Sequence, residues 1–366
     1  MNKILCANSF QATSDGHGGN RRTYQIQELT NLAGLEIISL QKEFVKTTKY
    51  ERVINSLKFL LKYKVEFYPS RNFINVCGHT YENFQKVLSQ HKSKKILLWE
   101  STANPLFLLV AAEYGFKTIA LPQNLESLVV GQTDLFTRQS LPQSLENELG
   151  YLGKANAIFC ISREEQWFLK LRGIDADFLP YYPPKAILFN LLEVRKQRNI
   201  LSNNRFLILG TAHNPPTRIG IIEQIQWLSE ISKSLDFPID IAGYGTENLK
   251  EYCNSSNFTL HGSVSVEKLN SLLVNSKAVL VHQKTGSGAL TRIPEMIIAG
   301  IPIIGNSQAC RSAFHYSGVY TYDNQVELAE LMSNSFDLPP ILERPRSAER
   351  RFVQYIRQLA ANSENS

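Results

Sequence analysis

The sequence predicts an α/β protein of two Rossmann-like βαβ domains that face each other across a cleft. Short apolar runs alternate with longer amphipathic segments along the whole chain, which is typical of βαβ units. A chain of 366 residues with 43% hydrophobic content is large enough to bury two cores. Residues 278–304 add a local signal, because they read as strand, glycine turn, helix, glycine and strand.

Six strands are expected in each half of the chain. In the first half they fall at residues 3–7, 35–40, 73–77, 95–99, 117–121 and 156–160. In the second half they fall at residues 205–209, 238–242, 258–261, 278–282, 301–304 and 318–321. These expectations divide the chain into an N-terminal domain (1–184), a linker (185–204), a C-terminal domain (205–345) and a final helix and tail (346–366).

The glycine turn of the second half is suited to a phosphorylated ligand. Gly286 and Gly288 precede a helix expected over residues 295–299, which Gly300 closes. Backbone N–H groups at a helix entrance lack partners and lie at the positive end of the helix dipole, so a diphosphate can approach them. Glu295 can accept two hydrogen bonds from a vicinal diol such as a ribose. The alternative is a tight βα turn with a satisfied glutamate.

The wider run Gly-Ser-Gly-x-x-Thr-Arg-x-x-Glu-x-x-x-Ala-Gly-x-Pro, residues 286–302, resembles the donor-site signature of GT-B fold glycosyltransferases. The resemblance is to the retaining, nucleotide-sugar-dependent "glycosyl transferases group 1" family. It implies that the glycine loop faces the diphosphate of the donor, that Arg292 neutralises it and that Glu295 binds the ribose. A fixed cation can stabilise a departing diphosphate without a metal. The alternative for Arg292 is a surface salt bridge.

Other segments resemble the same family in the same order. Residues 18–22, Gly-Gly-Asn-Arg-Arg, are similar to its N-terminal glycine loop, and residues 121–127 to its "His-Asn-x-Glu-Ser" turn. Residues 157–165 resemble the last strand of its first domain and the following helix, where Ser162 and Glu165 can form a capping box. In this fold a C-terminal helix returns to the first domain, and residues 347–361 form either that helix or a frayed amphipathic tail. Only residues 41–72 and the last stretch match poorly.

Ligands of open α/β sheets bind at the carboxyl ends of the strands, where the candidate site residues fall. The catalytic candidates are Arg292, Glu100 and His79. The donor-binding candidates are Gly18, Gly19, Gly243, Gly245, His261, Gly286, Ser287, Gly288, Thr291 and Glu295. The acceptor-side candidates are Gln123, Asn124 and Glu126. Glu100 is either an acid/base group or a partner of the next helix, and His79 has a structural alternative.

The chain departs from the family pattern at several positions. Ser287 stands where many members carry a first glutamate, Leu290 replaces a usual lysine, and Gln123 stands where relatives have histidine. After the first strand of the second half, only Arg218 remains of a usual basic pair. The expected activity is transfer of a sugar from a UDP- or GDP-linked donor to a glycan or lipid-linked acceptor in surface polysaccharide or lipopolysaccharide assembly, with no cofactor and no metal. The alternatives are a degenerate module that binds without turnover and a nucleotide-sugar epimerase.

The net charge of +6 is unevenly distributed. Residues 42–64 contain seven basic and two acidic side chains, hence +5, interleaved with apolar residues. A basic amphipathic helix of this kind can contact anionic lipids, or it can be an ordinary packed helix with a solvated lysine face. No nucleic-acid motif accompanies the cluster, so nucleic acid is not expected as a partner.

Five cysteines without metal-ligand or redox spacing indicate small buried hydrophobes in a reducing compartment. No signal peptide is evident, and no apolar stretch reaches the roughly 18 residues of a membrane span. We therefore expect a cytoplasmic protein, with any membrane contact at the inner face of the cytoplasmic membrane.

Overall fold

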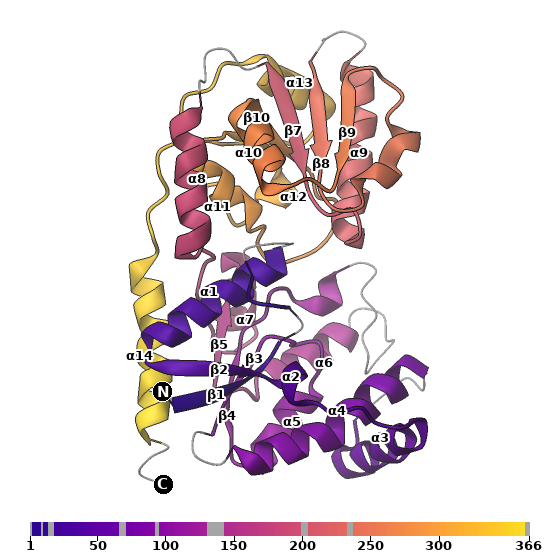
Figure 1. The fold of residues 1–366 in the computed structure, drawn as a ribbon, viewed down its shortest axis with the longest axis vertical. Helices are drawn as coiled ribbons and strands as arrows, with labels where there is room; N and C mark the ends of the chain where they lie inside the picture. Colours follow the sequence, from indigo (N-terminus) through magenta and orange to yellow (C-terminus); the bar gives the residue numbers. More distant parts are fainter. Residues whose placement is uncertain are drawn as a thin grey trace. The chain divides into compact units, whose positions relative to one another are not determined.

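The computed structural model describes residues 2–8, 10–13, 18–65, 71–91, 95–129, 143–198, 204–232 and 237–362. The chain divides into two units. The first comprises Met1–Thr13, Arg22–Pro180 and Pro345–Ser366, and the second comprises Ser14–Arg21 and Tyr181–Arg344. Each unit is built on one six-stranded sheet whose paired strands are all parallel (Figure 1). The predicted α/β class is therefore confirmed.

The first unit has the strand order β2-β1-β3-β4-β5-β6. Its strands are β1 (Asn2–Ala7), β2 (Leu35–Ser39), β3 (Ile96–Trp99), β4 (Lys117–Ala120), β5 (Ala157–Cys160) and β6 (Asp177–Phe178). Its helices are α1 (Gly18–Leu32, divided between the units after Arg21), α2 (Leu40–Glu43), α3 (Lys49–Tyr63), α4 (Arg71–Gln90), α5 (Leu106–Glu113), η1 (Glu126–Leu128), α6 (Gln143–Leu152), α7 (Arg163–Leu171) and α14 (Arg346–Asn362). The order reverses between β1 and β3, and such a switch point is where open α/β sheets bind ligands.

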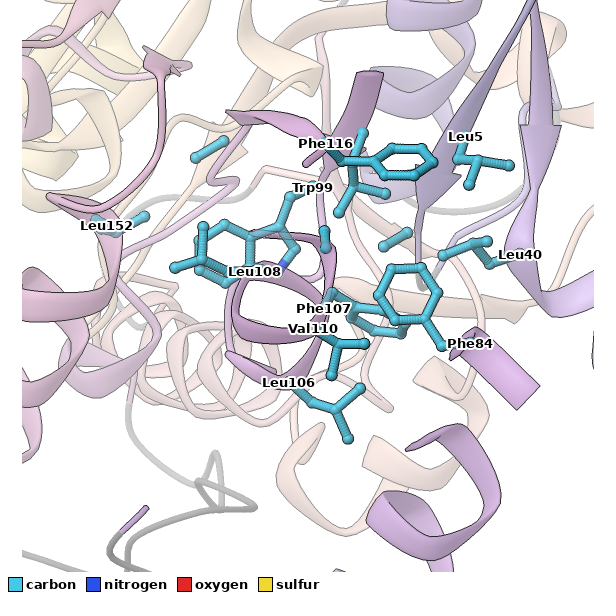
Figure 2. Packing of buried hydrophobic residues seen from close by; sticks show 14 of the residues in the cluster. Leu5, Leu40, Phe84, Trp99, Leu106, Phe107, Leu108, Val110, Phe116 and Leu152 are labelled. Carbon is cyan, nitrogen blue, oxygen red and sulfur yellow. The ribbon is translucent and has the colours of Figure 1, made fainter. Parts of the chain in front are cut away.

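Alternate residues of the central strands bury against opposite layers of helices. Leu5 and Trp99 belong to one hydrophobic cluster, whereas Ile4 and Leu98 belong to the other. Figure 2 shows the first cluster, in which Trp99 lies among residues of α5, with Phe84 of α4 beside them. Burial on both faces explains why these strands read as continuous apolar runs in the sequence.

The strand expected at residues 73–77 is wrong, because this run forms part of helix α4. The buried side chains of α4 recur at helical spacing well beyond the five-residue run. They are Phe73, Cys77, Tyr81, Phe84, Val87 and Leu88. A helical period sustained over twenty residues outweighs a short apolar run. Cys77 and His79 therefore lie in a helix and not in or after a strand.

The last helix, α14, belongs to the first unit. Its residues Phe352, Val353 and Ile356 are buried, and the ring of Phe352 lies 5.1 Å from that of Phe159 on β5. Tyr355 donates a hydrogen bond from its hydroxyl to the carbonyl of Asn156 at 2.9 Å. Of the two alternatives for the end of the chain, the returning helix is therefore correct, and the residues after 362 lie outside the described part.

The second unit has the strand order β12-β11-β10-β7-β8-β9. Its strands are β7 (Arg205–Leu209), β8 (Ile239–Ala242), β9 (Phe258–Gly262), β10 (Ser276–Val281), β11 (Ile303–Asn306) and β12 (Val319–Tyr322). Its helices are α8 (Lys185–Gln197), α9 (Pro215–Ile231), η3 (Thr246–Tyr252), α10 (Val266–Val274), α11 (Arg292–Ile298), α12 (Ser307–Cys310) and α13 (Gln325–Ser333). This is the dinucleotide-binding strand order, and its switch point lies between β7 and β10.

Helix α8 occupies most of the range predicted as a linker, and residues 199–203 of that range lie outside the described part. Helix α11 begins at Arg292, three residues before the expected start, so Arg292 and Glu295 share its first turn.

We predict that Gly78→Ala destabilises the protein. A Cβ at Gly78 would lie 2.0 Å from the carbonyl oxygen of Arg52, so α3 and α4 would have to move apart. Overpacking of this kind costs about 1–3 kcal/mol in the free energy of unfolding. Gly150→Ala in α6 is the matched control, since nothing lies within 4 Å of its added Cβ and alanine gains up to about 1 kcal/mol in a helix. Denaturant unfolding of both variants measures the difference, and equal stabilities would contradict the prediction.

Candidate functional site

The glycine loop between β10 and α11 has a backbone that only glycine adopts without strain. Gly286 has φ of 110° and Gly288 has φ of 75°. Arg311 donates hydrogen bonds to the carbonyls of Ser287 at 2.5 Å and Gly288 at 2.9 Å. The amide of Gln308 donates to the carbonyl of Gly286 at 3.1 Å. These two residues fix the loop through its carbonyl groups, and no sequence motif pointed to either of them.

Arg292 lies where the ends of β7 and β10 meet. Its Nη1 donates to the carbonyl of Leu209, the last residue of β7, at 2.7 Å. Its Nε is buried and finds no hydrogen-bond acceptor among the described residues. Burial lowers the pKa of the guanidinium to about 10, so the group stays charged at neutral pH. A buried cation without a carboxylate is costly, and an anionic ligand would relieve that cost.

The surface salt bridge considered for Arg292 does not form among the residues that the structure describes. The arginine lies instead at the switch point of the sheet, beside the end of β7. Its neighbour Thr291 approaches Gly18 closely, since a Cβ at Gly18 would lie 2.5 Å from the Thr291 hydroxyl oxygen. The N-terminal glycine segment and the motif of the second unit therefore meet at this position, and Gly19 follows in the first turn of α1.

Both carboxylate oxygens of Glu295 have partners. The hydroxyl of Tyr181 donates to Oε1 at 2.6 Å, and Nη1 of Arg21 donates to Oε2 at 2.5 Å. Glu295 is only 4% exposed. A ribose diol that binds this carboxylate must therefore replace Tyr181, Arg21 or both. Arg21 belongs to the glycine segment identified in the sequence, but nothing there indicated its partner, and Tyr181 had no signal at all.

The turn after β8 approaches the end of β7 too closely for a side chain. A Cβ at Gly243, whose φ is 129°, would lie 2.0 Å from the carbonyl oxygen of Gly210. Gly245, with φ of 80°, lies against the ring of His213. The His213 ring in turn lies 4.6 Å from that of Tyr244, which is exposed. This turn therefore presents backbone and one aromatic pair beside Gly210.

His261 has a different setting from the one predicted for a donor-binding residue. Its Nε2 lies 2.7 Å from Asp240, which also binds Arg205 at 2.8 Å. Although burial raises the pKa of Asp240, hydrogen bonds from Arg205 and His261 hold it below its usual value. These contacts give His261 a structural role between β8 and β9, and its contact with a donor stays a prediction.

Glu100 follows β3 at the switch point of the first unit. Its backbone N–H donates to the carbonyl of Ala7, the last residue of β1, at 3.0 Å. The carboxylate is buried and accepts a hydrogen bond from the Thr23 hydroxyl at 2.5 Å. Burial raises the pKa of Glu100 to about 7, against the opposing effects of Thr23 and the charge of Arg22. Such a carboxyl group can exchange a proton near neutral pH. Its helix partner Thr23 belongs to α1, whereas the structural alternative expected one at the start of the next helix.

The acceptor-side candidates lie in the turn after β4. Asn124 donates a long hydrogen bond of 3.5 Å to Glu126, and Gln123 precedes them in the same half-buried turn. Burial raises the pKa of Glu126 to about 7, and the charge of Glu148 adds to the effect. Glu148 accepts hydrogen bonds from the backbone of Glu126 and of the following residue at 2.7 and 2.9 Å.

The capping box expected at the start of α7 forms only in part. Ser162 accepts a hydrogen bond from the backbone N–H of Glu165 at 3.1 Å. The Glu165 side chain accepts instead from the backbone of Leu125 at 2.8 Å. The glutamate therefore fixes the turn that carries Gln123, Asn124 and Glu126.

His79 lies in α4, so its predicted position at a strand end is wrong. Its Nδ1 lies 3.0 Å from the Thr47 hydroxyl, and burial together with the charge of Arg52 lowers its pKa. The histidine connects α4 to the segment before α3, and its catalytic role stays a prediction.

The part of the chain that the structure describes holds neither a metal-binding cluster nor a membrane-spanning helix. The described residues contain no group of three or more His, Cys, Asp or Glu side chains arranged to hold a metal ion. Among them, no helix has both the length and the apolar character that crossing a membrane requires. All five cysteines are free, and four of them are buried.

We predict that Glu100 makes stability depend on pH. Its pKa is higher in the folded protein than the ordinary 4.5, so its proton is lost more easily on unfolding and stability falls as pH rises from about 4.5 to 7. The glutamine in Glu100→Gln does not titrate. The variant should therefore gain up to about 3 kcal/mol relative to the wild type between pH 4.5 and 8. Denaturant unfolding across this range measures the difference, and a constant difference would contradict the shift.

No protein-family model matches the chain, and no curated protein matches its sequence. Solved structures do match. Sucrose-phosphate synthase from Thermosynechococcus elongatus aligns with a TM-score of 0.60 at 13% identity, over 100% of this chain and 94% of the other. HepE from Anabaena, solved with UDP and glucose, aligns with a TM-score of 0.57 at 10% identity, over 100% and 94%.

A UDP-GlcNAc 2-epimerase from Methanocaldococcus jannaschii also aligns, with a TM-score of 0.55 at 14% identity, over 97% of this chain and 100% of the other. Identities this low establish a shared fold and nothing further. The chain therefore has the GT-B fold, an α/β architecture of two Rossmann-like domains.

Proposed function

We propose that this protein is a glycosyltransferase that moves a sugar from a nucleoside diphosphate to an acceptor. The observation that carries the proposal is the buried Arg292 guanidinium, whose Nε lacks an acceptor among the described residues, at the switch point of a dinucleotide-type sheet. The glycine loop lies in the same connection between β10 and α11, and Glu295 lies one turn further on. A nucleotide-sugar donor needs a cation and a glycine loop for its diphosphate and a carboxylate for its ribose diol.

In the proposed reaction the leaving diphosphate gains negative charge as its bond to the sugar breaks. Arg292 and the N–H groups of the glycine loop stabilise that charge, and they are fixed before the reaction begins. The loop is fixed by Arg311 and Gln308, and Arg292 by the Leu209 carbonyl. We therefore propose a reaction that needs no metal and no cofactor, with UDP or GDP as the nucleotide.

The finer assignments extend the proposal to the first unit. We assign acid/base chemistry or binding of an acceptor hydroxyl to Glu100, and acceptor contacts to Gln123, Asn124 and Glu126. Retention of configuration without a committed nucleophile, a glycan or lipid-linked acceptor, and a place in surface polysaccharide assembly follow from the family resemblance. We further propose a cytoplasmic setting, in keeping with five free cysteines.

An epimerase is the second candidate, because a UDP-GlcNAc 2-epimerase shares the fold. An epimerase interconverts nucleotide sugars without an acceptor, whereas a transferase releases the nucleoside diphosphate. Incubation with UDP-GlcNAc, followed by NMR of the sugar and an assay of released UDP, separates the two reactions. A degenerate module, suggested by Ser287, Leu290 and Gln123, would bind nucleotide and do neither.

We predict that the protein binds one of UDP, GDP and ADP in a calorimetric titration. Glu295→Ala should weaken that binding at least tenfold, about 1.4 kcal/mol, because the ribose loses its acceptor. Glu330→Ala, at an exposed glutamate of α13 in the same unit, is the matched control and should bind as the wild type does. Since Glu295 also holds Tyr181 and Arg21, circular dichroism must show that the variant is folded. Absence of binding to folded wild-type protein would refute the donor site.

We predict a different pattern for Arg292→Met. Removing the cation should weaken binding of the nucleoside diphosphate at least tenfold (about 1.4 kcal/mol). Binding of the corresponding monophosphate should be weakened much less. Glu295→Ala should instead weaken the binding of both ligands by the same factor, because each carries the ribose. Competition titrations with UDP and UMP, or the matching pair for another base, give the two ratios. Equal losses for both ligands in Arg292→Met would show that the arginine supports the fold rather than the diphosphate.

A further inference from the structure

Helix α3 faces the protein with a side that mixes polar and apolar residues. It lies beside α4 and begins with a capping box between Thr48 and Glu51 (Figure 1). Asn55 and Ser56 are each 2% exposed. Asn55 donates to Glu82 of α4 at 2.9 Å, and Ser56 donates to the carbonyl of Ile74, also on α4, at 3.2 Å. Phe59 is the fully buried apolar residue of the helix.

The opposite side of α3 exposes large apolar side chains to solvent. Tyr50, Val53, Leu57 and Leu61 are 75%, 43%, 54% and 80% exposed. Their spacing of three, four and four residues places them on one face of the helix. We call these four residues the α3 stripe. Phe59, Leu60 and Tyr63 of the same helix pack on the core, so the stripe is a second apolar side of α3 and a candidate interaction surface.

Lysines border the α3 stripe on both sides. At 100° per residue, Lys49 lies on one side of the stripe, and Lys58 and Lys62 lie on the other. The whole segment 42–64 carries +5. Two of its charges have partners, since Lys62 lies 2.6 Å from Glu113 and Arg52 is bound to Thr47 and Asn75. An apolar stripe with cationic borders is complementary to an anionic lipid surface, into which the apolar side chains insert while the lysines contact phosphates.

We propose that the α3 stripe is a docking surface for membranes that contain anionic lipids. A second copy of this chain is a poor occupant, because pairing two stripes would bring their bordering lysines together. A lipid surface can take up the apolar side chains of the stripe, and its phosphates can contact the bordering lysines. The proposal rests on α3 alone and does not depend on the transfer reaction.

Co-sedimentation of the full chain with vesicles tests the proposal. Wild-type protein should bind vesicles of phosphatidylcholine and phosphatidylglycerol, and should bind pure phosphatidylcholine weakly. The double variant Leu57→Ser, Leu61→Ser should lower the partition coefficient at least about tenfold. Leu171→Ser is the matched control, because Leu171 is an equally exposed leucine, 85%, at the end of α7 in the same unit. Both sites are exposed, so thermal unfolding should change little in either variant.

Two further measurements make the outcome decisive. Lys49→Glu, Lys58→Glu should lower binding to anionic vesicles, and added salt should lower binding of the wild type. In the variant Leu57→Trp the emission of the added tryptophan should shift to the blue on anionic vesicles, and in Leu171→Trp it should not. Failure of the wild type to bind, or equal binding by the serine variant, overturns the proposal. Concentration-dependent dimers in sedimentation that the serine variant abolishes, without vesicle binding, would assign the stripe to a second copy.

Discussion

The second unit depends on space for one buried guanidinium, that of Arg292, at the carboxyl ends of its central strands. A Cβ at Gly210 would lie 2.6 Å from Nη1 of Arg292, so the residue after β7 must be glycine for the arginine to reach the Leu209 carbonyl. The neighbouring strand ends also approach each other closely. Gly243 lies against Gly210 and donates its N–H to the carbonyl of Gly262 at 2.8 Å. The ends of β7, β8 and β9 thus meet backbone to backbone beside the Arg292 guanidinium.

In the proposed donor site, the partners that Glu295 already has would determine how strongly a nucleotide is held. A ribose would form two hydrogen bonds to the carboxylate and would displace those from Tyr181 and Arg21, one of which is charge-assisted. Only the difference between the two sets appears as affinity.

Most strands of the fold could be predicted because they are buried on both faces and are therefore continuous apolar runs, as in residues 278–282. The exceptions have physical reasons. Residues 73–77 carry a similar run, but it is the start of a longer helical pattern in α4. Strand β6 has two residues and pairs only with β5, which is too short for any periodicity. In the site, the local motif identified Arg292 and Glu295, although the helix was expected to begin only at Glu295. The partners of Glu295 lie far away in sequence, 274 residues for Arg21 and 114 for Tyr181, where no spacing rule applies.

Helix α3 shows why amphipathicity in a sequence does not determine which face is buried. The alternation of lysines with apolar residues predicted a helix, and it also suggested that the apolar face packs on the protein. The buried face is instead decided by α4, which offers Glu82 and backbone carbonyls to Asn55 and Ser56 and leaves Gly78 free of a side chain for close approach. Because residues 73–77 were expected to form a strand, the sequence did not reveal that helix α4 packs against α3 and orients it. The stripe therefore faces outward even though other apolar residues of α3, Phe59 among them, pack on the core.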